Sequence, residues 1–203
     1  MTRQRSSGFG WGVLALLGLV ALGSRNAGPS TSIARSALER PKVPTGGADP
    51  IAWAMSRFNT IRLVLATIAP QLAAEDVRRV ALSILAQWSH ETNKGRNEFN
   101  FNLGGWMAAA GEPFFTATGA EDPGRPSLRF ASFDDLTGGV RLQLERLRAR
   151  FASAVRLLVA DPESSAWVEQ LGKSGYYTAP IAAYARAWAT HRTELGGLLA
   201  GVA

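Results

Sequence analysis

The sequence contains no cysteine and only two histidines among its 203 residues. The lack of cysteine excludes a disulfide framework, a cysteine-ligated zinc site and a thiol nucleophile. The histidines, His90 and His191, lie far apart in the sequence and form no metal-ligand pattern, so we expect a site without a metal ion or other cofactor. The hydrophobic fraction of 46% is too high for a disordered protein, and the length suits one folded domain with an appendage.

Most of the chain has almost no net positive charge, although the formal net charge of the whole sequence is +6. Residues 1–48 contain six basic residues against Glu39 as their one acid, a net charge of +5. The other 16 bases and 15 acids give residues 49–203 a net charge of only +1. A nearly neutral domain argues against a basic nucleic-acid-binding surface, so no nucleic acid partner is expected.

The N-terminal region contains the longest apolar run. Residues 9–23 read FGWGVLALLGLVALG, and Arg3 and Arg5 precede them. A charged start followed by a short apolar stretch is typical of a secretory signal, and the run is short against the roughly 20 residues of a spanning helix. Residues 1–23 are therefore expected to be an apolar helix that serves as a signal peptide or as an uncleaved membrane anchor. The turn-forming residues of 24–48 predict a flexible linker.

Residues 49–203 are expected to form a mainly α domain of the α+β kind, a helical bundle with a small β-hairpin lobe. The first helix is predicted from Asp49-Pro50 to about Ile68, because proline is favoured early in a helix. The second is predicted from about Leu72 to Glu91. Its apolar residues recur at spacings of three and four, which indicates one buried stripe: Val77, Val80, Ala81, Ile84, Leu85 and Trp88.

The second half of the domain combines one hairpin with further helices. Two β-prone segments, 114–118 and 128–130, flank a turn and predict the hairpin. Ser132 and Asp135 then resemble a capping box, which predicts a helix beginning at Ser132. Its apolar stripe continues from Val140 through Phe151 to Leu158 without a break. Two more helices are expected, one over about 163–171 and one at the C-terminal end.

Glu91 is the most informative acidic residue. It continues the apolar stripe three residues beyond Trp88, so its carboxyl is expected on the inward face at a helix end. Desolvation raises the pKa of a carboxyl, and an acid that keeps its proton near neutral pH can protonate a leaving group. The alternative is that Glu91 reaches solvent at a frayed helix end.

The segment that follows, residues 89–106, is polar and rich in asparagine and glycine, with aromatic residues interleaved. Asparagine and glycine tolerate left-handed backbone, so this segment predicts a specific irregular loop. Amide groups beside flat rings suit a sugar, which has hydroxyls at its edges and C–H groups on its faces. We therefore expect Asn102, Phe99, Phe101 and Trp106 to line a substrate groove, with at least one of the three rings packed in the core instead.

These segments resemble a known family. Glu91-Thr92 with Gly95, followed by Asn102-Leu103-Gly104, resembles the catalytic segment of the glucosaminidase family, glycoside hydrolase family 73. The segment 175–180, GYYTAP, is similar to that family's Gly-Tyr-x-Thr-Asp-Pro. The likeness spans roughly residues 50–190. It implies a lysozyme-like fold and hydrolysis of the β-1,4 bond after N-acetylglucosamine in peptidoglycan, as in flagellar rod-assembly hydrolases, autolysins and phage lysins.

The resemblance also implies roles for single residues. Glu91 matches the family's general acid, Tyr176 its tyrosine near the active centre, and Asn102 the first residue of its groove motif. Tyr177 is expected in the groove wall or the core. Three further positions depart from the family pattern: Asn93 replaces glycine, Gly104 replaces phenylalanine and Ala179 replaces aspartate.

A second carboxylate, which the family often places on its β-lobe, has two candidates here. Glu121 and Asp122 lie in the predicted hairpin turn, and either is a candidate, although an exposed hairpin tip would hold the same residues. The separation of the two carboxyls decides between retention and inversion in glycosidases. That separation is not readable from the sequence.

The expected function is that of a peptidoglycan hydrolase, an endo-β-N-acetylglucosaminidase. The alternatives are a muramidase or lytic transglycosylase that uses the same fold and the same lone glutamate, or a non-catalytic peptidoglycan-binding or virion structural module. The expected partners are glycan strands, the membrane through residues 1–23, and an envelope-spanning machine or a virion. The expected location is the periplasm or cell envelope, exported or membrane-anchored, or alternatively the virion.

Overall fold

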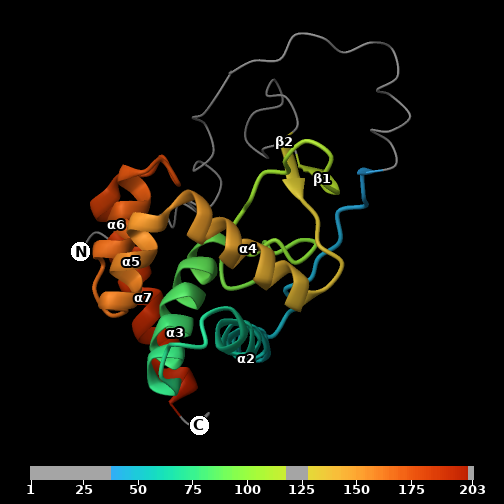
Figure 1. Ribbon diagram of the computed structural model, residues 1–203. Helices are drawn as coiled ribbons and strands as arrows, with labels where there is room; N and C mark the ends of the chain where they lie inside the picture. The colour runs from blue at the N-terminus through green and yellow to red at the C-terminus, as the bar shows by residue number, and fades with distance from the viewer. Residues whose placement is uncertain (1–37, 118–127, 201–203) are drawn as a thin grey trace, which may run out of the picture.

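The computed structural model describes residues 38–117 and 128–200 (Figure 1). In this part of the chain there are six helices: α2 (Pro50–Ile68), α3 (Ala74–Glu91), α4 (Leu136–Arg150), α5 (Ala152–Ala160), α6 (Ala166–Lys173) and α7 (Ile181–Leu199). Strands β1 (Phe114–Ala117) and β2 (Leu128–Ala131) form an antiparallel pair in which Phe115 lies opposite Phe130. The predicted mainly α class with one small hairpin is confirmed. The expected apolar helix within residues 1–23 lies outside the described residues.

Helix α3 forms the centre of the domain, because it packs against both α2 and α7 (Figure 1). Every residue from Ser83 to Ser89 is buried, so this helix is covered on all sides over its second half. The predicted apolar stripe is buried throughout: Val77, Val80, Ala81, Ile84, Leu85 and Trp88. Since Glu91 is the last residue of this central helix, the fold brings its carboxyl from the core to the edge of the domain.

The starts of two helices depend on aspartate caps. The side chain of Asp49 accepts hydrogen bonds from the backbone N–H groups of the first turn of α2, which begins at Pro50 as predicted. Helix α4 is capped by Asp135, which accepts from Gly138 N at 2.8 Å. The prediction that Ser132 starts this helix is wrong: its hydroxyl instead accepts a hydrogen bond from the Asn100 amide.

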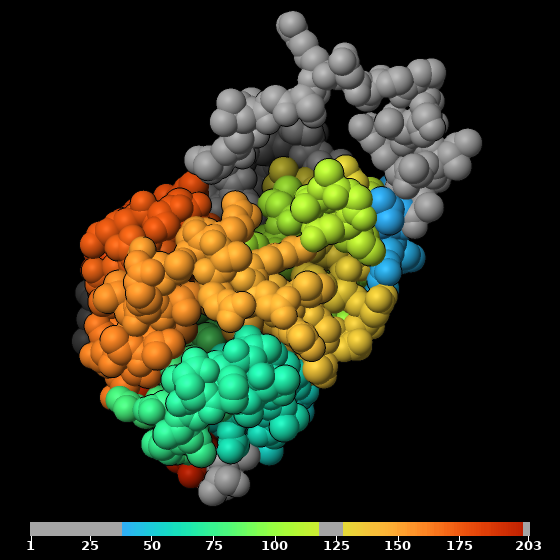
Figure 2. Space-filling model, in the orientation of Figure 1, coloured from blue at the N-terminus to red at the C-terminus, as the bar shows by residue number. Residues whose placement is uncertain are grey.

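The long helix predicted after the hairpin is divided in two at Phe151, whose backbone leaves the helical region at φ −128° and ψ 41°. The break redirects the chain so that α5 packs against α6. The ring of Phe151 remains buried and contacts Tyr176 and Trp106. In the space-filling view α4 lies across this face of the molecule, with α2 below it and the residues leading into β1 above it (Figure 2).

The described part of the expected linker, residues 38–48, lies against the folded body. Arg40 N donates to Phe114 O at 2.7 Å, Asn100 N donates to Val43 O at 2.9 Å, and Thr45 N donates to Glu98 O at 3.1 Å. The folded body therefore begins before residue 49. Within the described ranges, no helix combines the length and the apolar character needed to cross a membrane.

Candidate functional site

Glu91 is half-buried at the C-terminal end of α3. Tyr184 donates a hydrogen bond to its Oε1 atom, and Gln87 Nε2 lies 3.2 Å from the same oxygen. No described residue donates to Oε2. Desolvation raises the pKa of Glu91 to about 7, although both hydrogen bonds favour the ionised form and lower it. The carboxyl is therefore divided between its two protonation states near neutral pH.

Gln87 connects this carboxyl to two tyrosines. It is fully buried one turn before Glu91, a spacing that places both side chains on the same helix face. Its Nε2 atom lies 3.0 Å from the hydroxyl of Tyr184 and 3.2 Å from the hydroxyl of Tyr176. Gln87 was not predicted from the sequence as a site residue, although its i, i+4 spacing from Glu91 indicates a side chain on the same helix face.

Tyr184 is held in place from both sides. Its ring stacks on Tyr177 with the ring centroids 3.7 Å apart, and the edge of His90 contacts it at 4.7 Å. The hydroxyl of Tyr177 donates to Val168 O at 2.9 Å, so Tyr177 supports Tyr184 from the core. Desolvation, followed by the charge of Glu91, raises the pKa of Tyr184, and burial lowers the pKa of His90. Near neutral pH the tyrosine remains a donor and the histidine adds no positive charge.

Tyr176 brings the turn between α6 and α7 next to the loop that follows α3. Its hydroxyl donates to Gly104 O at 2.9 Å. Its ring contacts Phe151 and Trp106 at centroid distances of 5.3 and 5.7 Å. The structure thus joins Tyr176 to Glu91 through Gln87. These contacts bring together two residues that the family resemblance had paired.

Trp106 packs beside this network and is only 6% exposed. Its indole N–H is buried, and none of the described residues accepts a hydrogen bond from it. A Cβ atom added to Gly104 would lie 2.7 Å from this nitrogen and 3.0 Å from the Tyr176 hydroxyl. Position 104, where the resembling family has phenylalanine, therefore has no room for a side chain here, because Trp106 and Tyr176 fill the space.

The loop from residue 92 to residue 106 is irregular, as predicted, and it contains left-handed backbone. Asn93 and Lys94 have φ values of 49° and 57°, in the left-handed region. Asparagine tolerates this region better than most residues, so Asn93 suits its left-handed backbone. Gly95 is required, because a Cβ atom there would lie 2.5 Å from the Trp53 ring.

Glu98 anchors this loop from inside the protein. Its carboxylate is completely buried and forms an ion pair with Arg57, with 2.7 Å between Arg57 Nη2 and Glu98 Oε1. Trp53 Nε1 and the Thr45 hydroxyl donate to the same carboxylate at 2.6 and 2.9 Å. All of its partners belong to α2, the loop and the 38–48 segment, and none is part of the Glu91 network. The role of Glu98 is therefore structural.

The remaining residues expected in a groove are placed differently. Asn102 is 5% exposed, and its amide group binds Trp106 N, Trp106 O and Ala131 O within the protein. These hydrogen bonds within the protein favour a structural role for Asn102. Phe99 contacts Lys42 and Phe115, and the carbonyl of Phe101 accepts from Gln143. No described contact joins Phe99 or Phe101 to Glu91.

The described surroundings of Glu91 contain no charged hydrogen-bond partner. The candidates for a second carboxylate, Glu121 and Asp122, lie outside the described residues. Among the residues that are described, the hydrogen-bond partners of Glu91 are uncharged. In the same ranges, no group of three His, Asp or Glu side chains is placed to hold a metal ion.

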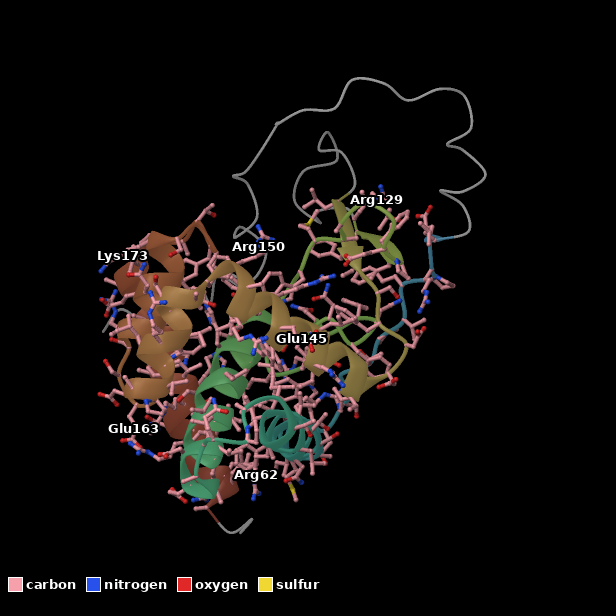
Figure 3. The ribbon with its side chains drawn as sticks, viewed as in Figure 1. Arg62, Arg129, Glu145, Arg150, Glu163 and Lys173 are labelled. Atoms are coloured by element: carbon pink, nitrogen blue, oxygen red, sulfur yellow. The ribbon has the colours of Figure 1, made fainter. Side chains whose placement is uncertain are left out.

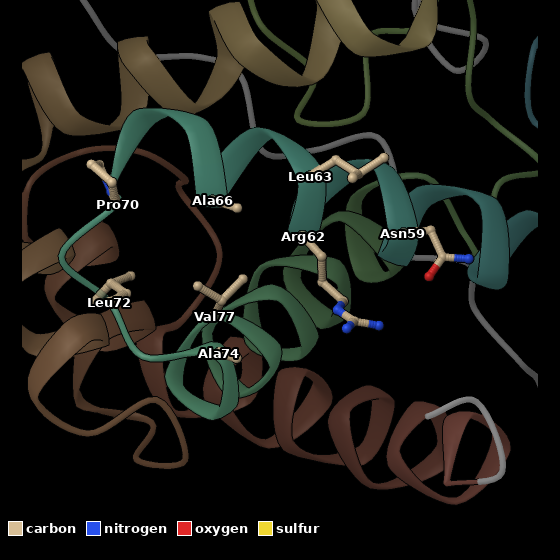
Figure 4. A pocket seen from close by; sticks show the side chains of 8 residues that line it. All are labelled: Asn59, Arg62, Leu63, Ala66, Pro70, Leu72, Ala74 and Val77. Carbon is tan, nitrogen blue, oxygen red and sulfur yellow. The ribbon is translucent and has the colours of Figure 1, made fainter.

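A hollow of about 530 Å³ lies between α2 and the start of α3 (Figure 4). It is lined by Asn59, Arg62, Leu63, Ala66, Pro70, Leu72, Ala74 and Val77. The lining comes from α2, the connection that follows it and the first turn of α3, whereas Glu91 is in the last turn of α3. The hollow is therefore separate from the Glu91 network.

No protein-family model, curated protein or solved structure matches this chain. The geometry around Glu91 is consequently the basis for the functional assignment.

Proposed function

We propose that this protein cleaves the β-1,4 glycosidic bonds of peptidoglycan as an endo-β-N-acetylglucosaminidase, with Glu91 as general acid. The observation that carries the proposal is the carboxyl of Glu91, which burial keeps partly protonated near neutral pH. A general acid with a pKa near the working pH contributes on the order of 10²- to 10⁴-fold in rate. The helical body with a small hairpin lobe supports a lysozyme-like α+β fold.

The hydrogen bonds around Glu91 suit proton donation. Tyr184 and Gln87 both contact Oε1, so Oε2 is the atom that presents the proton to the oxygen of the leaving sugar. When the proton leaves, the carboxylate that forms already accepts two hydrogen bonds, which stabilise its charge. As the leaving oxygen takes the proton, the acetamido oxygen of the sugar bonds to the anomeric carbon. Glu91 then removes a proton from the water that attacks this carbon and releases the acetamido group.

The aromatic residues next to the acid suit a sugar ligand. Tyr176 is partly exposed and lies against the buried rings of Trp106 and Phe151, so it is the member of this aromatic group that solvent reaches. In the proposed mechanism, Tyr176 orients the reacting sugar against the acid. Desolvation and then the charge of Glu91 raise the pKa of Tyr176, so its hydroxyl acts as a neutral hydrogen-bonding group.

A muramidase or lytic transglycosylase is a second candidate. It would use the same carboxyl as both acid and base, and the partners of Glu91 among the described residues are uncharged, as such a site requires. For the anhydro product, a hydroxyl of the same muramic acid attacks the anomeric carbon in place of water, and Glu91 removes the proton of that hydroxyl. The same bond type is broken, but the products end in muramic acid or its anhydro form.

Mass spectrometry of the products from purified peptidoglycan tests the proposal. New N-acetylglucosamine reducing ends are expected with the full-length protein, and their absence with Glu91→Gln. Muramic-acid or anhydro ends would support the second candidate. Binding to insoluble peptidoglycan without any released product would contradict both and identify a non-catalytic binding module. The proposed place of action is the cell envelope, which the apolar run at residues 9–23 supports.

A further inference from the structure

Helix α4 contains four arginines that differ in their partners. Arg141 pairs with Glu145 on the same helix, and Arg146 pairs with Glu112. Arg148 and Arg150 are exposed near the C-terminal end of α4, and neither has a carboxylate partner within the described ranges. Two cations near the end of this helix therefore have no carboxylate partner among the described residues.

Only one of these two cations adjoins the aromatic group beside Glu91. The guanidinium carbon of Arg150 lies 5.8 Å from the ring centroid of Trp106 and 5.8 Å from that of Phe151. Figure 3 shows Arg150 at the end of α4 that adjoins α5 and α6. A guanidinium held against ring faces still has its N–H edges free, and these edges match a carboxylate in a bidentate manner.

A continuous set of contacts leads from this cation to the proposed acid. Trp106 and Phe151 both pack against Tyr176, and Gln87 links Tyr176 to Glu91. Glu91 and Tyr176 are partly exposed and Arg150 is exposed, so each of them can be reached from solvent. The same corner also contains the buried indole N–H of Trp106, which has no acceptor among the described residues. Arg150 and Trp106 are the donors of this corner, and among the described residues neither is paired with a carboxylate.

We infer that Arg150 is a specificity-determining residue that binds a carboxylate of the ligand seated at Glu91. The inference rests on the proposed function, and it adds a requirement for a negative charge some distance from the reacting bond. Peptidoglycan strands carry carboxylates on their peptide stems. Chitin oligosaccharides have the same N-acetylglucosamine units and β-1,4 bonds but no carboxylate. The protein should therefore distinguish these two ligands through Arg150.

Calorimetric titration of the full-length protein tests the inference without requiring turnover, with Glu91→Gln as the common background. The ligands are a soluble glycan tetrasaccharide with peptide stems and uncharged chitotetraose. Arg150→Gln is expected to weaken binding of the charged ligand about tenfold, as for the loss of one charge-assisted hydrogen-bonded pair, and to leave chitotetraose binding unchanged.

Arg148→Gln, which removes the same charge from the same helix end, should change neither affinity. Arg150→Lys should restore only part of the loss, because it keeps the charge but not the bidentate geometry.

The possible outcomes separate this inference from the proposed function. Equal weakening of both ligands by Arg150→Gln would indicate a packing role and overturn the inference, as would an unchanged affinity for the charged ligand or a failure to bind either ligand. Loss of charged-ligand binding with Arg150→Gln, together with a wild-type protein that releases no product from peptidoglycan, would support this site while contradicting the catalytic proposal. Release of product at the same rate by Arg150→Gln and the wild-type protein, with equal affinities for the charged ligand, would support the catalytic proposal and overturn the inference about Arg150.

Discussion

The hydroxyl of Tyr184 donates a hydrogen bond to Oε1 of Glu91 and so joins the first turn of α7 to the last residue of α3. This contact lowers the pKa of the carboxyl, as does the contact with Gln87, but desolvation by burial has the larger effect and raises it to about 7. The acidity of Glu91 is therefore a balance between burial and two donors, and each side of the balance can be changed separately.

Removing the Tyr184 donor should raise the pKa of Glu91 further. In Tyr184→Phe the ring and its stacking on Tyr177 are kept, while the hydrogen bond that favours the carboxylate is lost. An NMR titration of the ¹³C-labelled carboxyl is expected to give a midpoint above that of the wild-type protein. Tyr177→Phe is the matched control, because its hydroxyl binds Val168 O instead. A midpoint that is unchanged or lower in Tyr184→Phe would contradict this account of the site.

The stability of the protein should depend on pH through Glu91. Because its pKa is about 7 in the folded state and 4.5 is the ordinary value, the folded state holds the proton more tightly than the unfolded chain does. The contribution of the Glu91 proton to the free energy of unfolding is therefore lost as the pH rises from about 4.5 through 7. Glu91→Gln removes this loss. Its melting temperature relative to wild type is expected to be higher at pH 8 than at pH 5.

The control for this experiment is Glu145→Gln, which changes an exposed carboxylate on α4 in an i, i+4 pair with Arg141. Its effect on the melting temperature should be the same at both pH values. If Glu91→Gln behaves like this control, the carboxyl of Glu91 is not desolvated by folding.

Breaking the buried ion pair of Glu98 should destabilise the whole domain. Glu98→Gln leaves the Arg57 guanidinium buried without its counter-charge and weakens the contacts with Trp53 and Thr45. Removal of one partner of a buried pair typically costs about 3–5 kcal/mol, whereas an exposed pair contributes about 0–1 kcal/mol. Urea unfolding of Glu98→Gln beside Glu145→Gln measures the difference. Equal midpoints for the two variants would show that this anchor is dispensable.

The space at Gly104 gives a steric prediction. Alanine there places a Cβ atom 2.7 Å from Trp106 Nε1 and 3.0 Å from the Tyr176 hydroxyl, so both rings must shift. Overpacking of this kind typically costs about 1–3 kcal/mol. Gly197→Ala in α7 is the control, because nothing lies within 4 Å of its added Cβ atom and alanine favours a helix. Thermal unfolding should show Gly104→Ala destabilised and Gly197→Ala unchanged or stabilised.

Local patterns were sufficient to predict most of the fold. The apolar spacing in α3 and the β-prone segments 114–118 and 128–130 correspond to elements found in the structure. The break at Phe151 was not predictable from the apolar spacing, because the stripe continues through it. Its position depends on a tertiary arrangement in which the ring of Phe151 packs against Tyr176 and Trp106.

The candidate site was predictable only where it follows helix geometry. Glu91 continues the stripe of α3, and burial of that stripe accounts for its raised pKa. Tyr184 and Gly104 join it through contacts between segments distant in sequence, which no local pattern contains. Asn102 shows the opposite problem: an asparagine in an irregular loop can bind a sugar or satisfy the loop's own backbone. In this structure its amide binds the backbone.

The most direct test of the central claim is the rate at which purified peptidoglycan is cleaved by the wild-type protein and by Glu91→Gln at pH 6. Glutamine keeps an oxygen that can accept from Tyr184 and Gln87 but has no acidic proton to give. The rate is expected to fall on the order of 10²- to 10⁴-fold, while circular dichroism and the thermal transition show a folded protein. A folded Glu91→Gln variant that cleaves peptidoglycan at the wild-type rate would contradict the account.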